Sequence, residues 1–156
     1  MALNHPRAKE MDLFIATDPD ADRLGVVVLD EQKQPVLLSG NQIGVLLLDF
    51  LIQEKQKQGK DLTNYFLAKT IVTSDMGSCL AEKYGIETRN TLTGFKFIGE
   101  QITQSELRQD KQFLFGYEES FGYLIEPFVR DKDAIQAAIL MAEMALYYKQ
   151  QQSSIL

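Results

Sequence analysis

The sequence predicts an α/β fold, and two observations support this prediction. Segments with the apolar pattern of strands alternate with segments of helical period throughout residues 34–152. Residues 12–16 and 66–73 are largely apolar at consecutive positions, which is typical of strands inside a sheet that is covered on both faces. We therefore expect a layered α/β domain in which helices pack on a sheet.

The first part of the chain reads as a polar lead followed by strands. Residues 1–10 form the lead, which holds the only histidine, His5. Strands are expected at 12–16, 25–29 and 34–38, with residues 30–33 as the polar turn between the last two. Because the first of these strands needs neighbours, residues 13–16 should form an exposed apolar edge.

The remaining elements follow in regular order. Asn41 is expected to cap a helix that runs to about residue 56 and ends at residues 59–61. Further strands are expected at 66–73, 86–91 and 113–117, and further helices at 78–84, 97–107 and 133–150. Gly85 should stop the short helix at 78–84.

Composition excludes several functional classes. The 156 residues carry a formal charge of −6, which argues against a general affinity for nucleic acid or an anionic membrane. The single cysteine, Cys79, cannot form an intramolecular disulfide, and no apolar run is long enough to span a bilayer. One histidine excludes a zinc site of histidines and cysteines. A cytoplasmic location is the default prediction.

The most informative segment is an acidic loop between two strands. Asp18, Asp20 and Asp22 alternate, and Arg23 follows them. Like charges at this spacing repel one another and add nothing to a core, so a bound divalent cation is the simplest reason for them. Hard oxygen ligands suit Mg²⁺, and the guanidinium of Arg23 favours a phosphate beside it. The alternative is a solvated acidic turn.

Three other loops hold candidate binding residues. Thr93 and Gly94 precede a helix and offer backbone N–H groups to an anion, with Lys96 in the first turn. Adjacent acids and a hydroxyl lie among aromatic residues and glycines at 115–123, a composition that suits sugar hydroxyls. Residues 130–133 precede the last helix and combine a cap with free cations. Each of these loops alone could also be an ordinary turn or helix start.

Taken together in this order, the four loops resemble the α-D-phosphohexomutase superfamily, which includes phosphoglucomutases and phosphomannomutases. Residues 18–23 match its magnesium loop, 93–96 its Gly-aromatic-Lys loop, 118–120 its sugar-recognition loop, and 130–133 the segment before the last helix of its third domain. The resemblance implies that residues 1–34 are the end of the second domain and form a strand pair with the metal loop. It also implies that residues 35–152 form the α/β/α third domain with a mixed sheet, and that 153–156 are a tail.

The resemblance also implies roles for individual residues. The metal ligands for Mg²⁺ would be Asp18, Asp20 and Asp22. Catalytic roles would fall to Arg23, Lys96 and Lys132. The residues expected to bind substrate are Thr93, Gly94, Lys96, Glu118, Ser120, Arg130 and Lys132.

The expected activity is the interconversion of glucose 1-phosphate and glucose 6-phosphate through a phosphoserine and glucose 1,6-bisphosphate. The sequence has no Thr-Ala-Ser-His-Asn-Pro-like segment for the phosphorylated serine and no phosphate-binding loop of a fourth domain. We therefore expect a fragment that is inactive alone and whose partners include the missing domains of its parent chain. A phosphopentomutase of the same family, or a non-catalytic module that binds a sugar phosphate and Mg²⁺, remain open as alternatives.

Overall fold

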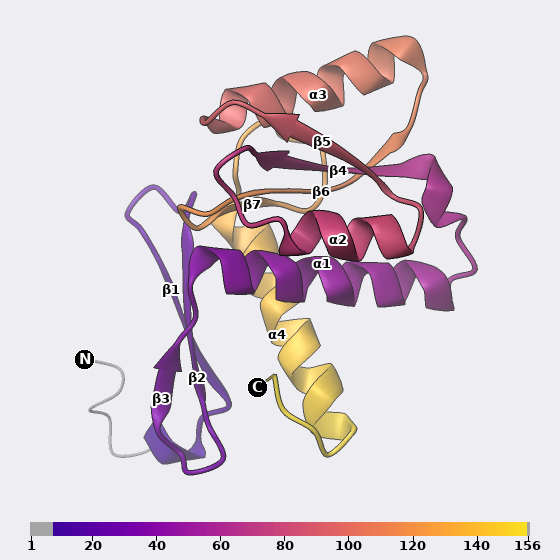
Figure 1. Cartoon of the computed structure of the whole chain (residues 1–156). Coiled ribbons are helices and arrows are strands. Elements are labelled where there is room, and N and C mark those ends of the chain that lie inside the picture. The colour runs from indigo at the N-terminus through magenta and orange to yellow at the C-terminus, as the bar shows by residue number, and fades with distance from the viewer. Residues whose placement is uncertain (1–7, 156) are drawn as a thin grey trace.

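The computed structural model describes residues 8–155 and consists of a three-layered α/β body with an antiparallel hairpin sheet beside it (Figure 1). His5, noted in the polar lead, lies outside the described residues. None of the described helices is long and apolar enough to cross a bilayer.

The strands are β1 (Leu13–Thr17), β2 (Leu24–Leu29), β3 (Pro35–Leu37), β4 (Tyr65–Thr70), β5 (Glu87–Thr91), β6 (Gln112–Glu118) and β7 (Gly122–Leu124). The α-helices are α1 (Gly40–Lys57), α2 (Met76–Lys83), α3 (Phe95–Arg108) and α4 (Ala134–Gln150), and short 3-10 turns cover Ala8–Glu10 and Leu62–Asn64.

The main sheet has the strand order β5-β4-β6-β7. Strand β4 is parallel to both β5 and β6, whereas β7 is antiparallel to β6, so the sheet is mixed. Helix α3 lies on one face of the sheet, and α1 and α2 lie on the other (Figure 1). All six residues of β4 are buried, as expected for a strand covered on both faces. The predicted α/β/α layering is thus confirmed.

The N-terminal sheet has three antiparallel strands in the order β1-β2-β3. Strand β3 pairs with β2, so residues 35–37 join the predicted strand pair as a third strand; the domain division at residue 34 stays a prediction. Strand β1 has a partner on one side only among the described residues. Ile15 is 37% exposed and Ala16 is exposed as well, in keeping with the expected apolar edge.

Several predicted boundaries were wrong. Ser39, not Asn41, caps α1: its hydroxyl accepts from the Gln42 N–H, and the Gln42 side chain accepts from the Ser39 N–H, which is a capping box. Strand β4 ends at Thr70, three residues early, because residues 71–75 form the turn into α2. Strand β7 was not predicted, since its three residues are too few for a periodic signal.

Helix α4 connects the two parts of the structure. It starts beside β7 and runs toward the hairpin sheet, as the yellow ribbon of Figure 1 shows. Its inner side chains, among them Met141 and Met144, belong to the same buried core as Val26 and Val28 of β2. This shared core fixes the hairpin sheet, and the loop between β1 and β2, against the α/β body.

Candidate metal and substrate site

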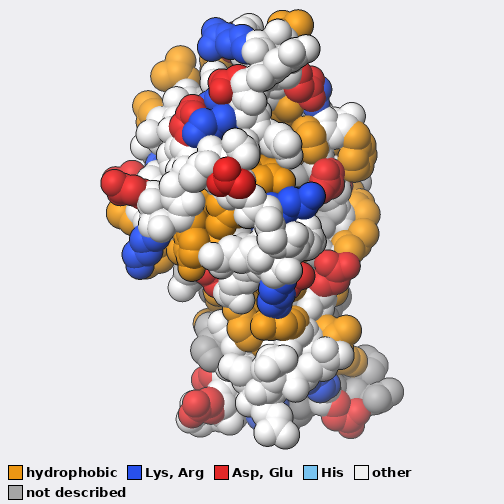
Figure 2. Space-filling view, turned by 90° about the vertical axis from the view of Figure 1, so that its right-hand side faces the viewer, with side chains coloured by type: hydrophobic (Ala, Val, Ile, Leu, Met, Phe, Trp, Pro, Cys, Tyr) orange, Lys and Arg blue, Asp and Glu red, His pale blue; other side chains and the backbone are white. Residues whose placement is uncertain are grey.

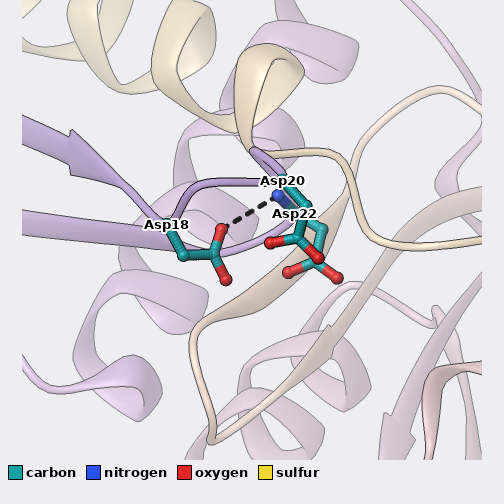
Figure 3. A group of neighbouring side chains, drawn as sticks. All are labelled: Asp18, Asp20 and Asp22. Carbon is teal, nitrogen blue, oxygen red and sulfur yellow. Dashed lines mark hydrogen bonds between the residues drawn. The ribbon is translucent and has the colours of Figure 1, made fainter.

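The three aspartates of the β1–β2 loop converge on one point. Asp18, Asp20 and Asp22 can each offer one carboxylate oxygen so that all three atoms lie within 4.8 Å of one another. Figure 3 shows the Asp20 and Asp22 carboxylates side by side, with that of Asp18 turned toward them. A group of hard oxygen donors at this spacing fits a divalent cation such as Mg²⁺.

Backbone hydrogen bonds hold Asp18 in place. Its Oδ1 accepts from the N–H of Arg23 at 3.0 Å and from the N–H of Asp22 at 3.1 Å, the second of which is dashed in Figure 3. The bond from Arg23 has the largest effect, and together these bonds lower the pKa of the Asp18 carboxyl below its usual value. Asp18 is therefore kept ionised with its second oxygen available to a ligand.

The metal loop is attached to two other elements. The Ala21 carbonyl accepts from the N–H of Ala134, the first residue of α4, at 3.0 Å, and Ala21 itself has a φ of +56°. On the other side, the Leu24 N–H donates to the Phe121 carbonyl at 3.0 Å, and Arg23 forms an isolated antiparallel bridge with Gly122. The loop thus depends on α4 and on the β6–β7 turn for its shape.

Lys132 reaches the metal loop from the segment before α4. Its Nζ lies 2.5 Å from Asp22 Oδ2 and 3.6 Å from Asp131 Oδ1. Burial works to lower the pKa of Lys132, but the hydrogen bond to Asp22 and the nearby charges of Asp131 and Glu118 outweigh it, so the pKa is raised. The ammonium group therefore stays charged beside the acidic cluster.

Glu118 lies at the end of β6, where Gly122 of β7 leaves room for it. Glu118 is buried, with 7% of its surface exposed. A Cβ added at Gly122 would come within 2.8 Å of both Glu118 Oε1 and Lys132 Cδ. Glycine thus leaves room for both side chains here, and Glu118, Lys132 and the metal loop come together at this point.

Ser120 shares an open cavity with the metal loop. Together with Phe121, it lines a space of about 360 Å³ whose other walls include Asp18 and Arg23. Residues with a hydroxyl, a guanidinium and a carboxylate thus border one open space, together with the apolar residues Ala16, Leu37 and Phe121. These groups can bind a polar, anionic ligand.

Other predicted residues lie apart from this group. Thr93 and Gly94 are exposed on the loop that follows β5, and Lys96 is exposed in the first turn of α3. The Lys96 ammonium lies 4.9 Å above the ring of Phe97.

Arg130 is directed toward α3. Its guanidinium bonds the Pro127 carbonyl and lies 2.5 Å from Glu106 Oε2. The assignments of this arginine and of the loop after β5 to substrate stay predictions.

A larger cavity lies at the far end of the sheet. It has a volume of about 450 Å³ and is lined by residues at the amino ends of β4 and β6, among them Tyr65 and Leu114. Figure 2 shows this face, where apolar side chains lie between acidic and basic ones. None of the predicted site residues lines this cavity. Because ligands of open α/β sheets bind at the carboxyl ends of the strands, we assign the site to the loops at that end.

Sequence reasoning missed one part of the site. Glu119, between the predicted ligands Glu118 and Ser120, turns away from them and accepts hydrogen bonds from Thr70 and Thr73 at the end of β4. These residues lie 46 to 49 positions apart in the sequence, and neither threonine stands in a motif. No local signal could have predicted this contact.

Comparisons with known proteins agree with this fold. The family described as phosphoglucomutase/phosphomannomutase, alpha/beta/alpha domain III, matches residues 39–156. A phosphoglucomutase of Staphylococcus epidermidis is 44% identical over 140 residues, which make up 90% of this chain and 24% of that protein. A phosphoglucomutase of Staphylococcus aureus is 44% identical over 142 residues, or 88% of this chain and 25% of that protein. The chain thus spans about a quarter of the length of these relatives.

Solved structures share the fold at low sequence identity. A putative phosphomannomutase from Thermus thermophilus superposes with a TM-score of 0.69 at 24% identity, over 92% of this chain and 28% of that one. An N-acetylphosphoglucosamine mutase of Aspergillus fumigatus, in complex with GlcNAc-6P and magnesium, gives a TM-score of 0.62 at 18% identity, over 87% and 33%. The family match over most of the chain, the shared fold and the arrangement of the loops lead to one conclusion: the chain belongs to the phosphoglucomutase/phosphomannomutase family and contains its α/β/α domain III.

Proposed function

We propose that this chain carries the metal-binding and sugar-binding parts of a Mg²⁺-dependent hexose phosphate mutase. The interconverted substrates would be glucose 1-phosphate and glucose 6-phosphate. The observation that carries the proposal is the hydrogen-bonded contact between the aspartate loop and the loop that holds Glu118 and Ser120. That contact supports the proposal, because it brings the three aspartates close to the loop with Glu118 and Ser120.

The three aspartates fit the metal. Asp18 and Asp22 each use one oxygen within the protein, and Asp20 makes no hydrogen bond among the described residues, so each carboxylate keeps an oxygen for the ion. When bound there, Mg²⁺ would neutralise negative charge on a phosphoryl group.

The remaining residues would bind and orient the sugar phosphate. Arg23, exposed beside Asp18, would bind phosphate oxygens through its guanidinium. Lys132 would keep a positive charge next to the reacting oxygens. Glu118 would accept hydrogen bonds from sugar hydroxyls, and Ser120 can both donate and accept. We also assign a phosphate contact to Lys96, with Thr93 and Gly94.

Calorimetric titration of Mg²⁺ and then of glucose 1-phosphate into the chain tests the proposal. Asp20→Asn should weaken Mg²⁺ binding by about tenfold or more, because it removes a charged ligand that makes no other contact. Glu118→Gln should weaken sugar phosphate binding and leave Mg²⁺ binding unchanged. The matched control is Asp12→Asn, which removes an exposed carboxylate that pairs with Lys149 at 2.8 Å, away from the three aspartates.

The same samples are then assayed for turnover of glucose 1-phosphate. We expect none, because the serine segment of the family is absent from the sequence. Turnover would show that this chain does contain a nucleophile that accepts the phosphoryl group, which would contradict the expectation of an inactive fragment. Equal effects of Asp20→Asn and Asp12→Asn on Mg²⁺ binding would refute the metal assignment.

A further inference from the structure

The side chain of Glu119 is held by two buried hydroxyl groups. Its Oε2 accepts from Thr70 Oγ1 at 3.1 Å and from Thr73 Oγ1 at 3.2 Å. Thr70 is 1% exposed and Thr73 is 3% exposed. A carboxylate that takes up two buried donors satisfies groups that water cannot reach.

The two threonines also contact each other, with their Oγ1 atoms 2.6 Å apart. The two hydroxyls supply only two protons, while three close oxygen pairs are present. Whether one threonine donates to the other or both donate to Glu119, the carboxylate is the final acceptor, because it alone has no proton to give. Without the Glu119 carboxylate, this buried pair would hold a donor with no partner.

The anchor for Glu119 is fixed independently of the loop that it holds. Lys69, 1% exposed, donates from Nζ to the Thr73 carbonyl at 3.0 Å and lies 3.4 Å from Asp75 Oδ1. Asn41 Oδ1 accepts from the Ser74 N–H at 3.0 Å. The turn after β4 is thus held by a buried cation and by α1, so Thr73 offers a rigid attachment point.

The backbone of Glu119 is confined as well. A Cβ added at Gly40, the first residue of α1, would come within 2.0 Å of the Glu119 carbonyl oxygen. Two residues further on, Phe121 has a φ of +69°, a conformation that costs a non-glycine residue energy and needs support from its surroundings. Glu119 therefore lies between Glu118 and a strained turn. Fixing its side chain restrains the backbone conformation of both neighbours.

We propose that Glu119 is the positioning residue of the 118–120 loop and that Thr70 and Thr73 serve it as an anchor. With the Glu119 side chain bound to β4, the side chain of Glu118 is directed toward Lys132 and Gly122, and Ser120 faces the cavity beside Asp18. The inference rests on the proposed function, because it assumes that Glu118 and Ser120 bind the sugar.

The test compares two double variants of this chain. Thr70→Val with Thr73→Val keeps the shape of both side chains and removes both hydroxyls, whereas Thr70→Ser with Thr73→Ser keeps the hydroxyls. The first readout is the hydrogen exchange of the amides of residues 118–122 without ligand. The second is the calorimetric affinity for glucose 6-phosphate, and separately for Mg²⁺.

We expect the valine pair to speed amide exchange in residues 118–122 and to weaken glucose 6-phosphate binding by about tenfold, with Mg²⁺ affinity within about twofold of the parent. The serine pair should restore both properties. A general loss of the fold would lower the Mg²⁺ affinity to the same extent, whereas release of the 118–120 loop alone leaves the metal loop its hydrogen bond to Ala134 of α4. Glu119→Ala should reproduce the valine pair, while Glu143→Gln, an exposed change on α4, should have no effect.

The two proposals can fail separately. If the unaltered chain binds Mg²⁺ but no glucose 6-phosphate, the sugar-binding proposal is refuted for this chain, and amide exchange alone decides the role of Glu119. Unchanged exchange in the valine pair would overturn the positioning role. So would equal loss of both ligands, because it would show that the threonines support the whole fold.

Discussion

Gly77 of α2 should tolerate no side chain, because the hydroxyl of Tyr117 lies against it. A Cβ added at Gly77 would come within 2.2 Å of Tyr117 Oη, where ordinary contacts are 3.4 Å or longer. The Tyr117 ring cannot move aside, since its other edge faces Gly44 of α1 and it stacks on Phe115 at 5.4 Å between centroids. We therefore predict that Gly77→Ala destabilises the chain, although alanine is normally the better helix residue.

The magnitude follows from two opposing effects. Overpacking of a rigid core costs about 1–3 kcal/mol, and a Cβ within 2.2 Å of Tyr117 Oη places Gly77→Ala in the upper part of that range, at about 2–3 kcal/mol. Replacing glycine by alanine in a helix gains about 1 kcal/mol. The net loss of about 1–2 kcal/mol in the free energy of unfolding should lower Tm by about 2–8 °C for a chain of this length. Urea titration followed by circular dichroism, with thermal melts, measures both quantities.

A second substitution, Tyr117→Phe, tests whether the Tyr117 hydroxyl causes the destabilisation. Tyr117→Phe removes the Oη, which is buried without a hydrogen-bond partner among the described residues, and leaves Cζ 3.2 Å from the added Cβ. Gly77→Ala should therefore cost little in the Tyr117→Phe background. Gly44→Ala is the matched control, because its Cβ would meet ring carbons at 2.2 and 2.4 Å that phenylalanine keeps. Equal rescue of both alanine variants, or stabilisation by Gly77→Ala alone, would show that this packing argument is wrong.

Two further predictions concern charge. Burial, with a smaller effect of the Asp75 charge, raises the pKa of Tyr117 to about 12, so its neutral form stabilises the fold fully below about pH 10 and this contribution is lost as the pH rises toward 12. Tyr117→Phe should therefore flatten the fall in the free energy of unfolding across that range in urea titrations, and parallel pH profiles would contradict this. Lys132→Met should tighten Mg²⁺ binding several-fold in calorimetry. The Lys132 ammonium lies 2.5 Å from Asp22 Oδ2, and without it nothing competes with the ion for that oxygen. Weaker binding would mean that Lys132 helps to build the metal site.

The sequence alone predicted those elements that depend on a pattern of neighbouring residues. The apolar run of β4 and the amphipathic helices predicted the layered fold. The alternating acids predicted a metal-binding loop, because three carboxylates within five residues repel one another unless a cation lies between them. The cap of α1 could also have been read correctly: Ser39 with Gln42 three residues later is a capping-box pattern, and the choice of Asn41 overlooked it.

The remaining features depend on contacts between distant segments. Strand β7 exists because Gly122 to Leu124 lie antiparallel to β6 after a tight turn, and a three-residue strand has no period to detect. The anchoring of Glu119 by Thr70 depends on the parallel pairing of β4 with β6, which brings residues 49 positions apart together. The ion pair of Arg130 with Glu106 could not be read from the sequence either, and the assignment of Arg130 to substrate stays a prediction.

The shape of the metal loop follows from the free donors at the start of α4. The first N–H groups of any helix lack partners within the helix. In α4 the Asp133 side chain accepts from Ile135 and Gln136, which leaves the N–H of Ala134 to donate to the Ala21 carbonyl. That bond supports Ala21 in a left-handed conformation, which turns the chain so that the acids on either side of it converge. The acidic motif therefore supplies the three carboxylates, and a helix more than a hundred residues later supports the loop geometry that brings them together.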